Sequence, residues 1–353
     1  ALLQAGDLRG AEAAVREAID RRPRDPALHN LLGVILKRQR QIKPAMACFE
    51  QALKFDKKHY GAQLNLGNTQ RETGDKPAAA QSYRQALTLK PKDPEAARLL
   101  ACTLAETGDA AAAMAAFQRA LLLAPQNGQI YADRAVAQYN FTRFAEALQD
   151  IERAIALPPA RRDHRILRGK ILRRIGRHQD AIGEFQALLR DDPGDPEVLF
   201  ALGNVYRYGL GDLRQANDNY RLALQRAPES AEILGALCGS LLNSRYDDEA
   251  AHIEEANRLA NRLVQRGNLP LAVIGDLQSI FLRTADYAGL ARFGDRDRLM
   301  RYWVASNDVG RLHNQLGRVE SDADRLSLVA YHRQWGDKMV ALAKAQPIQP
   351  APR

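Results

Sequence analysis

The sequence predicts an all-α protein: a right-handed solenoid of stacked helical hairpins, followed by a C-terminal helical adaptor. Three observations support this class. Prolines recur with a spacing of 34 residues, alanines recur with the same spacing, and Ala and Leu are abundant while aromatic residues make up only 6% of the 353 residues. A β-sandwich would need many more β-branched and aromatic residues. A fixed period of this length is the signature of a repeat array.

The period is marked at four kinds of position. Prolines lie at Pro23, Pro91, Pro125, Pro159, Pro193 and Pro228. Between the first two, the spacing predicts a proline at position 57, where the sequence has Lys57. Alanines lie at Ala11, Ala45, Ala79, Ala113, Ala147, Ala181, Ala216 and Ala250. Bulky residues follow four positions later at Phe49, Tyr83, Phe117, Ile151, Phe185 and Tyr220. Small residues lie upstream at Gly33, Gly67, Ala101, Ala135, Gly169, Gly203 and Cys238.

Each position has a physical reason in a pair of antiparallel helices. Small residues let the two helices cross closely, and the bulky residue fills the space beside them. Gly74, Gly108 and Gly176 suit the end of a first helix because glycine accepts a left-handed backbone. Proline ends each unit because it cannot continue a helix. One extra residue, placed in the turn at 206–211, accounts for the single break in the period.

These positions match a known frame, L-G-x…A-x-x-x-F-x-x-A…P. Leu66-Gly67, Ala79, Tyr83, Ala86 and Pro91 carry it once, and the same frame recurs from Leu202 to Pro228. The sequence therefore resembles the tetratricopeptide repeat family. We expect a half repeat over 1–25 and seven repeats over 26–264. The units begin at Pro26, Tyr60, Pro94, Gly128, Arg162, Pro196 and Ala231. The seventh unit departs from the frame, with Glu254 and Asn257 in place of the aromatic residue and the alanine.

The resemblance implies a concave groove, lined by the first helix of each unit, that binds a protein or peptide. The inward positions carry mainly cations, asparagines and tyrosines. The candidate groove residues are Lys37, Arg38, Asn65, Asn68, Arg71, Tyr139, Asn140, Lys170, Arg173, Arg174, Asn204, Arg207 and Tyr208. Residues 161–177 contain eight basic residues and one acid, so an acidic peptide is the expected ligand. The alternative is a solvated helix face with no partner.

The balance of charge does not by itself require nucleic acid. Lys and Arg total 51 and Asp and Glu total 42, which gives a net charge of +9. RNA binding is the less favoured hypothesis because the basic helix has no interleaved aromatic residues on which bases could stack.

After residue 264 the period is lost while helical patterning continues. We expect a helical adaptor over 265–345 and a Pro-rich linker over 346–353. Within the adaptor, the apolar stretch Leu269–Leu282 suits burial. Asp295 can cap a helix through Trp303, and Ser321 or Asp322 can cap a longer one through Leu342.

Two stretches of the adaptor carry a second resemblance. Residues 321–325 (Ser-Asp-Ala-Asp-Arg) and 331–336 (Tyr-His-Arg-Gln-Trp-Gly) resemble the segment that precedes the catalytic part of bacterial relatives of the O-linked N-acetylglucosamine transferases, the SPINDLY-type group of glycosyltransferase family 41. The resemblance implies that the chain is the recruiting arm of a protein glycosyltransferase. The sugar-nucleotide domain is absent from this chain, so no catalytic residue can be assigned and no catalysis is expected of the chain alone.

The remaining signals argue against other functions. No nucleophile–His–acid set, metal motif or cofactor motif is visible, so we expect no catalytic, metal or cofactor site. Cys48, Cys102 and Cys238 are odd in number and far apart, which favours inert thiols in a reducing compartment. No apolar run approaches 18 residues, so no membrane span is expected and a cytoplasmic location is predicted.

The alternative to a recruiting arm of a glycosyltransferase is a stand-alone scaffold of a secretion, pilus or signalling assembly.

Overall fold

A computed structural model describes residues 7–159, 161–267, 269, 273–293, 296–313 and 321–345. In these residues the chain forms α-helices joined by short turns, and no strand is present. The all-α prediction is confirmed. The chain divides into two compact units, Ala1–Ile175 and Gly176–Arg353, and the division falls in the turn between two helices.

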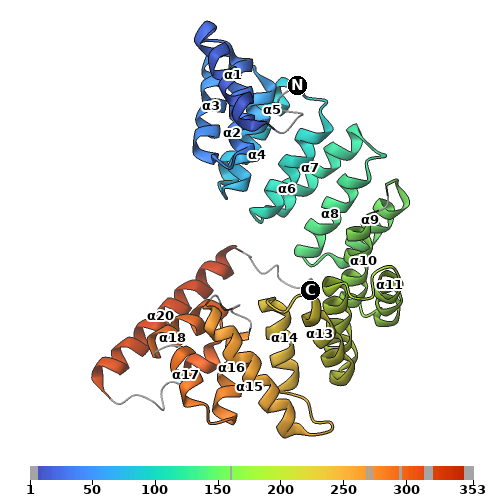
Figure 1. Ribbon diagram of the computed structural model, residues 1–353, viewed down its shortest axis with the longest axis vertical. Helices are drawn as coiled ribbons and strands as arrows, with labels where there is room; N and C mark the ends of the chain where they lie inside the picture. The colour runs from blue at the N-terminus through green and yellow to red at the C-terminus, as the bar shows by residue number, and fades with distance from the viewer. Residues whose placement is uncertain are drawn as a thin grey trace, which may run out of the picture. The chain divides into compact units, whose positions relative to one another are not determined.

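The first unit is a row of helical hairpins in which consecutive helices fold back on one another (Figure 1). Its helices are α1 (Leu8–Arg21), α2 (Pro26–Arg38), α3 (Ile42–Phe55), α4 (Tyr60–Glu72), α5 (Lys76–Leu89), α6 (Pro94–Glu106), α7 (Ala110–Leu123), α8 (Gly128–Asn140), α9 (Phe144–Ala156) and α10 (Arg162–Arg174). The even-numbered helices begin at the residues with which the 34-residue spacing starts each repeat. We call them the first helices, and their odd-numbered partners the second helices.

The second unit continues with α-helices of more variable length. They are α11 (His178–Asp191), α12 (Pro196–Val205), α13 (Leu213–Arg226), α14 (Ala231–Leu241), α15 (Glu249–Arg266), α16 (Ile274–Arg283), α17 (Tyr287–Phe293), α18 (Arg296–Ser306), α19 (Val309–His313) and α20 (Asp322–Ala345). Here α12 and α14 are first helices, and α13 and α15 are the second helices that pack against them.

The turns that join α2–α3, α4–α5, α6–α7 and α8–α9 share one geometry. After α4, Gly74 adopts a left-handed backbone with φ of 88°, and the Asp75 N–H donates to the Gln70 carbonyl at 2.9 Å. The Asp75 carboxylate then accepts from the Ala78 N–H at 3.1 Å and caps the next helix. The glycine closes one helix while the aspartate opens the other, so two residues complete the reversal.

The same turn recurs beyond the sequence period. Ala285 and Asn307 have φ of 51° and 61°. The Asp286 N–H donates to the Phe281 carbonyl at 2.9 Å, and the Asp308 N–H donates to the Trp303 carbonyl at 3.0 Å. Helices α16–α17 and α18–α19 are therefore joined as the repeat hairpins are, although no glycine marks either turn.

The extra residue of the sixth repeat is accommodated by a wider helical turn. Residues Tyr206–Leu210 form a π-helical turn, η1, that extends α12 up to the left-handed Gly211. A π-helical turn holds one more residue than an α-helical turn. The insertion therefore widens the end of the first helix and leaves the buried positions of α12 and α13 in register.

Small residues of the first helices lie directly against the bulky residues of the second. A Cβ atom added at Gly33 would lie 2.5 Å from the Phe49 ring, and one added at Gly203 would lie 2.5 Å from the Tyr220 ring. Phe49 and Tyr220 are themselves fully buried. The paired small and bulky positions of the sequence are thus the contact points of each hairpin.

The alignment of the seventh repeat in the sequence analysis is wrong. Ala250 is exposed, whereas His252, Ala256 and Leu259 are buried. The left-handed residue of this turn is Asp247, which lies 36 residues after Gly211. The longer turn shifts the frame, so the position of Tyr220 is taken by a small residue.

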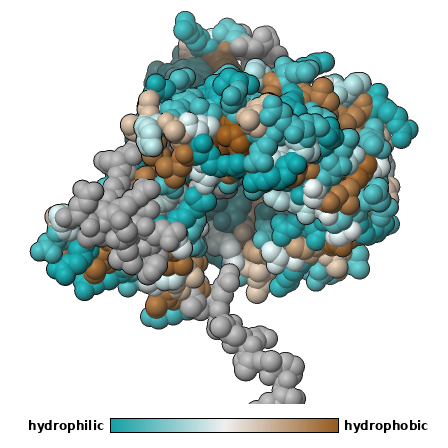
Figure 2. Space-filling view, turned by 90° about the horizontal axis from the view of Figure 1, so that it is seen from below, coloured by the Kyte–Doolittle hydropathy of each residue, from teal (hydrophilic) through white to brown (hydrophobic). Residues whose placement is uncertain are grey.

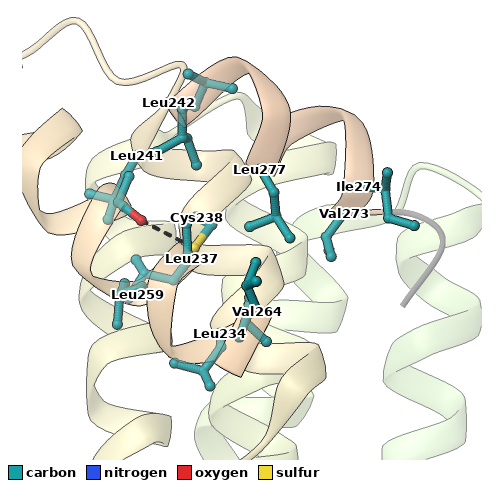
Figure 3. Packing of buried hydrophobic residues seen from close by; sticks show 14 of the residues in the cluster. Leu234, Leu237, Cys238, Leu241, Leu242, Leu259, Val264, Val273, Ile274 and Leu277 are labelled. Atoms are coloured by element: carbon teal, nitrogen blue, oxygen red, sulfur yellow. Dashed lines mark hydrogen bonds between the residues drawn. The ribbon is translucent and has the colours of Figure 1, made fainter. Parts of the chain in front are cut away.

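A medium-sized thiol opposite that small residue restores the packing. The Cys238 Sγ lies 3.7 Å from the carbonyl oxygen of Ala256. Figure 3 shows Cys238 enclosed by leucines of α14 and α15 and facing Leu277 of α16. In this hairpin a thiol therefore meets a small residue, where the other hairpins pair a small residue with a bulky one.

The C-terminal helices share one core with the last repeats. Buried Ile274, Leu277 and Phe281 of α16, Trp303 of α18 and Leu328 of α20 belong to the same apolar cluster as α14 and α15. The Asp324 N–H donates to the Ser321 Oγ at 3.1 Å, so Ser321 caps α20 as expected. Asp295, the N-terminal part of Leu269–Leu282 at 270–272 and the linker 346–353 lie outside the described residues.

In the face drawn in Figure 2, hydrophilic side chains cover most of the area and apolar side chains gather in small scattered patches.

Candidate functional site

On one face of the first helices, candidate groove residues of α2 and α4 contact acids that lie 35 residues later in the sequence. The Lys37 ammonium on α2 lies 2.7 Å from the Glu72 carboxylate on α4. The Arg71 guanidinium on α4 donates from Nε to the Glu106 carboxylate on α6 at 3.0 Å. Hydrogen bonding to Glu106 raises the pKa of Arg71 above its ordinary value. In this part of the face Lys37 and Arg71 are each neutralised by an acid of the next repeat.

A second row of contacts runs beside the first. The Asn65 amide on α4 donates to the Asn30 side chain on α2 at 2.9 Å. Arg98 on α6 pairs with Asp133 on α8, whose other carboxylate oxygen accepts from Gln129 at 2.7 Å. Asn65 therefore joins two first helices, and one of its two amide N–H groups is already used.

A hollow of about 140 Å³ lies between α4, α6 and α8. The paired Arg71 and Glu106 form one side of it, and Asp133 and Asn140 form the other. The Cys102 thiol faces the hollow and lies 3.5 Å from the Asp133 carboxylate. Burial, followed by the nearby Asp133 charge, raises the pKa of Cys102 to about 12, so the thiol stays protonated at neutral pH.

Two of the candidate asparagines serve as partners for buried tyrosines. The Tyr83 hydroxyl donates to the Asn68 side chain at 2.7 Å, and the Tyr220 hydroxyl donates to the Asn204 side chain at 2.8 Å. At the same first-helix position, Val34, Cys102 and Val136 lie in hairpins whose bulky residue is Phe49, Phe117 or Ile151. Asparagine occurs where the bulky residue has a hydroxyl group to satisfy.

The charge of the face changes at α10. The Arg174 side chain is exposed, and its guanidinium carbon lies 4.5 Å from the centre of the Phe144 ring and 5.9 Å from that of Tyr139. Arg174 occupies the position at which α4 and α6 carry Glu72 and Glu106. Lys170 and Arg173 are half-buried on the same helix, and Arg38 and Asn140 are exposed near the ends of α2 and α8.

In the second unit, Arg207 and Tyr208 lie in the π-helical turn. The Arg207 guanidinium donates to the Ala236 carbonyl at 2.7 Å and lies 4.8 Å from the Tyr208 ring centre. Asp276 on α16 is close by, since a Cβ atom added at Gly239 would meet both Asp276 and Arg207. Burial raises the pKa of Asp276, while the charges of Arg207 and Arg311 oppose this shift.

Sequence reasoning missed the acids that neutralise the groove cations and the ring beneath Arg174. Glu72, Glu106 and Asp133 each lie 35 residues after their cation, one repeat plus one residue. Opposite charges at this separation are a readable signal in an array with a period of 34. No sequence signal marks Phe144 as a partner of Arg174. Phe144 is the first residue of the second helix α9, just after the left-handed turn residue Thr142, and so it is not one of the inward positions of a first helix.

The described residues contain no group of three or more side chains that could hold a metal ion. Among the helices in the described part of the chain, none has the length and apolar character needed to cross a membrane.

Three family models match consecutive parts of the chain. The tetratricopeptide domain of cytochrome c-type biogenesis protein H matches residues 2–131, and two tetratricopeptide repeat models match 132–196 and 197–230. The chain is a tetratricopeptide repeat protein. Tetratricopeptide repeats form protein–protein interaction modules, and the inner face of the first helices is where this chain has its candidate binding residues.

Solved tetratricopeptide repeat structures share the fold. A repeat protein from Parabacteroides merdae has a TM-score of 0.55 at 17% identity, covering 67% of this chain and 93% of that one. A chain of the APC/C hetero-tetramer Cut9-Hcn1 has a TM-score of 0.55 at 16% identity, and the match covers 68% of this chain and 47% of that one. PilF of Pseudomonas aeruginosa has a TM-score of 0.50 at 19% identity, covering 64% and 97%. No curated protein matches the chain.

Proposed function

We propose that this chain is a recruiting scaffold whose first helices bind an extended peptide with its acidic residues at α10. One observation carries the proposal. Along the face, the corresponding positions hold Glu72, Glu106, Asn140 and then Arg174, and among the described residues Arg174 has aromatic partners and no carboxylate. A peptide with acidic residues at one end and neutral residues at the other complements this order of charges.

The setting of Arg174 suits carboxylate binding. A guanidinium that lies over an aromatic ring is held in place, while its N–H groups at the edge stay available for a bidentate bond. Hydrogen bonds to charged groups contribute about 1.5–3 kcal/mol each. Arg173 and Arg174 together therefore account for a tenfold change in affinity, which needs only about 1.4 kcal/mol.

The test is fluorescence anisotropy with three labelled peptides of equal length, rich in Asp and Glu, in Asn and Gln, or in Lys. We expect the acidic peptide to bind best, and the double variant Arg173→Ala, Arg174→Ala to weaken its binding at least tenfold. The difference should shrink as salt rises, because part of the attraction is screened. The matched control is Arg84→Ala, Arg153→Ala, which removes the same charge from exposed positions of the second helices α5 and α9. Equal losses in both double variants would contradict a site at α10.

The finer proposal is that the scaffold serves a protein glycosyltransferase of the SPINDLY type. It is supported by residues 331–336 on α20, whose Trp335 packs against the core that contains the last repeats. In that setting the chain recruits acceptor proteins and does not itself catalyse. The sequence encoded after Arg353 tests this: sugar-nucleotide motifs there support the proposal, and a stop codon contradicts it.

A second setting is favoured by the family model that matches residues 2–131, whose name refers to cytochrome c biogenesis. In that setting the bound peptide belongs to a component of cytochrome c assembly. Cross-linking of the chain in its own cells, followed by mass spectrometry, separates the two settings by the partner recovered. The cytoplasmic location stays a prediction from the cysteines.

A further inference from the structure

The last helix of the second unit has an exposed apolar side. One side of α20 packs against α18 and α19, and Leu328 is buried there (Figure 1). On the opposite side Leu326 is 66% exposed, Val329 is 42% exposed and Val340 is 53% exposed. The terminal helix of a repeat array normally has a polar outer side that keeps the array in solution. The outer side of α20 departs from this rule, which indicates a contact surface.

The exposed residues of α20 form one stripe whose spacing is the same in both directions. They follow one another at intervals of 4, 3, 4, 4, 3 and 4 residues, and at about 100° per residue they lie within an arc of about 80°. All are exposed, and they are Asp322, Leu326, Val329, Arg333, Asp337, Val340 and Lys344. Alternating intervals of three and four are typical of helices that pack against each other along their length.

The stripe is complementary to a second copy of itself that runs in the opposite direction. With the two Arg333 residues level, Asp322 of each copy lies opposite Lys344 of the other. In the same register Leu326 lies opposite Val340, and Asp337 comes within one helical turn of Arg333 of the second copy. A parallel pair would instead place each of these charges opposite its own like charge. The order of charges and apolar residues therefore favours an antiparallel pair of identical helices.

The charges of the stripe are available for such a contact. Among the described residues Arg333, Asp337 and Lys344 have no ion-pair partner. Asp322 lies 3.1 Å from Arg325 on its own helix, but both side chains are largely exposed, so this pair contributes little. The stripe contains two acids and two bases, so two copies do not repel each other. Zero net charge also makes it a poor surface for a strongly acidic or strongly basic peptide.

We propose that α20 pairs with α20 of a second copy of this chain and joins two arrays into a symmetric dimer. An interface on a two-fold axis must be complementary to itself, and the stripe centred on Arg333 meets this condition. From Asp322 to Lys344 the stripe is about 33 Å long at 1.5 Å per residue. Because each copy contributes a single helix, the interface belongs to the small class, below or near about 1,200 Å², and the dimer should dissociate on dilution. The proposal does not depend on the proposed function.

The test is sedimentation equilibrium of the whole chain over a hundredfold range of concentration. We expect the wild type to pass from monomer to dimer as its concentration rises. Leu326→Lys should weaken the dimer at least tenfold, because it places a cation against Val340 of the second copy, and Val340→Glu should weaken it equally. Leu122→Lys is the matched control, since Leu122 is an exposed leucine of α7 outside the stripe, and should dimerise as the wild type does.

A mixing experiment tests the register. An equimolar mixture of the Leu326→Lys and Val340→Glu chains should recover dimers, because the new cation then lies opposite the new carboxylate of the other chain. A mixture of Leu326→Lys with Val329→Glu is the control. Position 329 lies opposite Asp337 and not opposite position 326, so this mixture should stay monomeric.

Two further measurements keep the outcomes distinct. Circular dichroism should show the same helix content and melting temperature in all single variants at a concentration where the wild type is monomeric, because the substituted residues are exposed. The groove variant Arg173→Ala, Arg174→Ala should dimerise as the wild type does, which separates this proposal from the proposed function. A wild type that stays monomeric, a dimer unaffected by Leu326→Lys, or a first mixture that does not recover dimers would overturn the proposal.

Discussion

Arg71 on α4 is held by Glu106 on α6, which lies one repeat and one residue further along the chain, through a hydrogen bond of 3.0 Å from Nε. The contact joins two repeats on their inner face, where the sequence alone suggests a cation available to a ligand. The same relationship links Lys37 with Glu72. On α2 and α4, Lys37 and Arg71 are therefore already bonded to acids of this chain.

The first prediction concerns this pair. In a double-mutant cycle with Arg71→Ala and Glu106→Ala, we expect a coupling energy of about 0.5–1 kcal/mol, because both side chains are about one-third exposed. Urea unfolding followed by circular dichroism gives the four free energies. The cycle of Arg84→Ala with Glu106→Ala is the control and should give no coupling. A coupling energy of zero for Arg71 and Glu106 would mean that the pair does not hold the repeats together.

The second prediction concerns the tyrosines that bond to groove asparagines. Tyr220→Phe leaves the Asn204 side-chain oxygen without its donor in a half-buried place, and should reduce the free energy of unfolding by about 1 kcal/mol. Tyr83→Phe should have the same effect through Asn68. Tyr208→Phe, at a residue that is 61% exposed, is the control and should change little. Thermal unfolding of the three variants checks this: Tyr220→Phe and Tyr83→Phe should lower the melting temperature, and Tyr208→Phe should leave it nearly unchanged.

The third prediction concerns the contact between a small and a bulky residue. Gly33→Ala places a Cβ atom 2.5 Å from the buried Phe49 ring and should cost about 1–3 kcal/mol. Replacing the Phe49 ring with the smaller leucine side chain, in the double variant Gly33→Ala, Phe49→Leu, should recover part of that loss. The double variant should therefore lose less free energy of unfolding than the two single variants lose together.

Gly183→Ala is the matched control for that substitution. Gly183 lies inside α11, and a Cβ atom there would meet nothing within 4 Å. Since alanine favours the helix, this variant should gain about 0.5–1 kcal/mol. Equal effects of Gly33→Ala and Gly183→Ala on urea unfolding would show that helix propensity, and not the contact with Phe49, governs both sites.

Periodic features could be predicted from the sequence because each recurs in several repeats at a fixed spacing. The helix starts at Pro26 and Ala231, the left-handed Gly74 and the contact of Gly33 with Phe49 all follow from the spacing. The seventh hairpin could not be aligned, because its turn is longer and the small residue Ala256 stands opposite Cys238, where the other hairpins have a bulky residue. The hairpins after residue 265 were missed because Ala285 and Asn307 adopt the left-handed turn without glycine.

The candidate site is less predictable than the fold for a physical reason. The family frame shows which side of a first helix faces inward, but not which inward side chains are already bonded. Lys37 and Arg71 meet acids of neighbouring repeats, and Asn68 and Asn204 meet tyrosines of their own hairpins. These partners are 15 to 35 residues away, and the family frame by itself does not pair them.

The last prediction concerns the Cys102 thiol and alkaline pH. Burial raises its pKa to about 12 in the folded chain, whereas an exposed cysteine ionises near pH 8.5. Between these two values the unfolded chain releases the thiol proton and the folded chain keeps it. The stability that comes from the protonated thiol is therefore complete below pH 8.5 and is lost progressively as the pH rises toward 12. Cys102→Ala lacks this group, so its melting temperature should fall less than that of the wild type between pH 8.5 and pH 10.5.

At pH 8, Ellman's reagent should modify Cys102 far more slowly in the folded protein than in urea, because the thiolate is the reactive form. Rapid modification in the folded state, together with parallel pH curves for wild type and variant, would show that Cys102 is not held protonated beside Asp133.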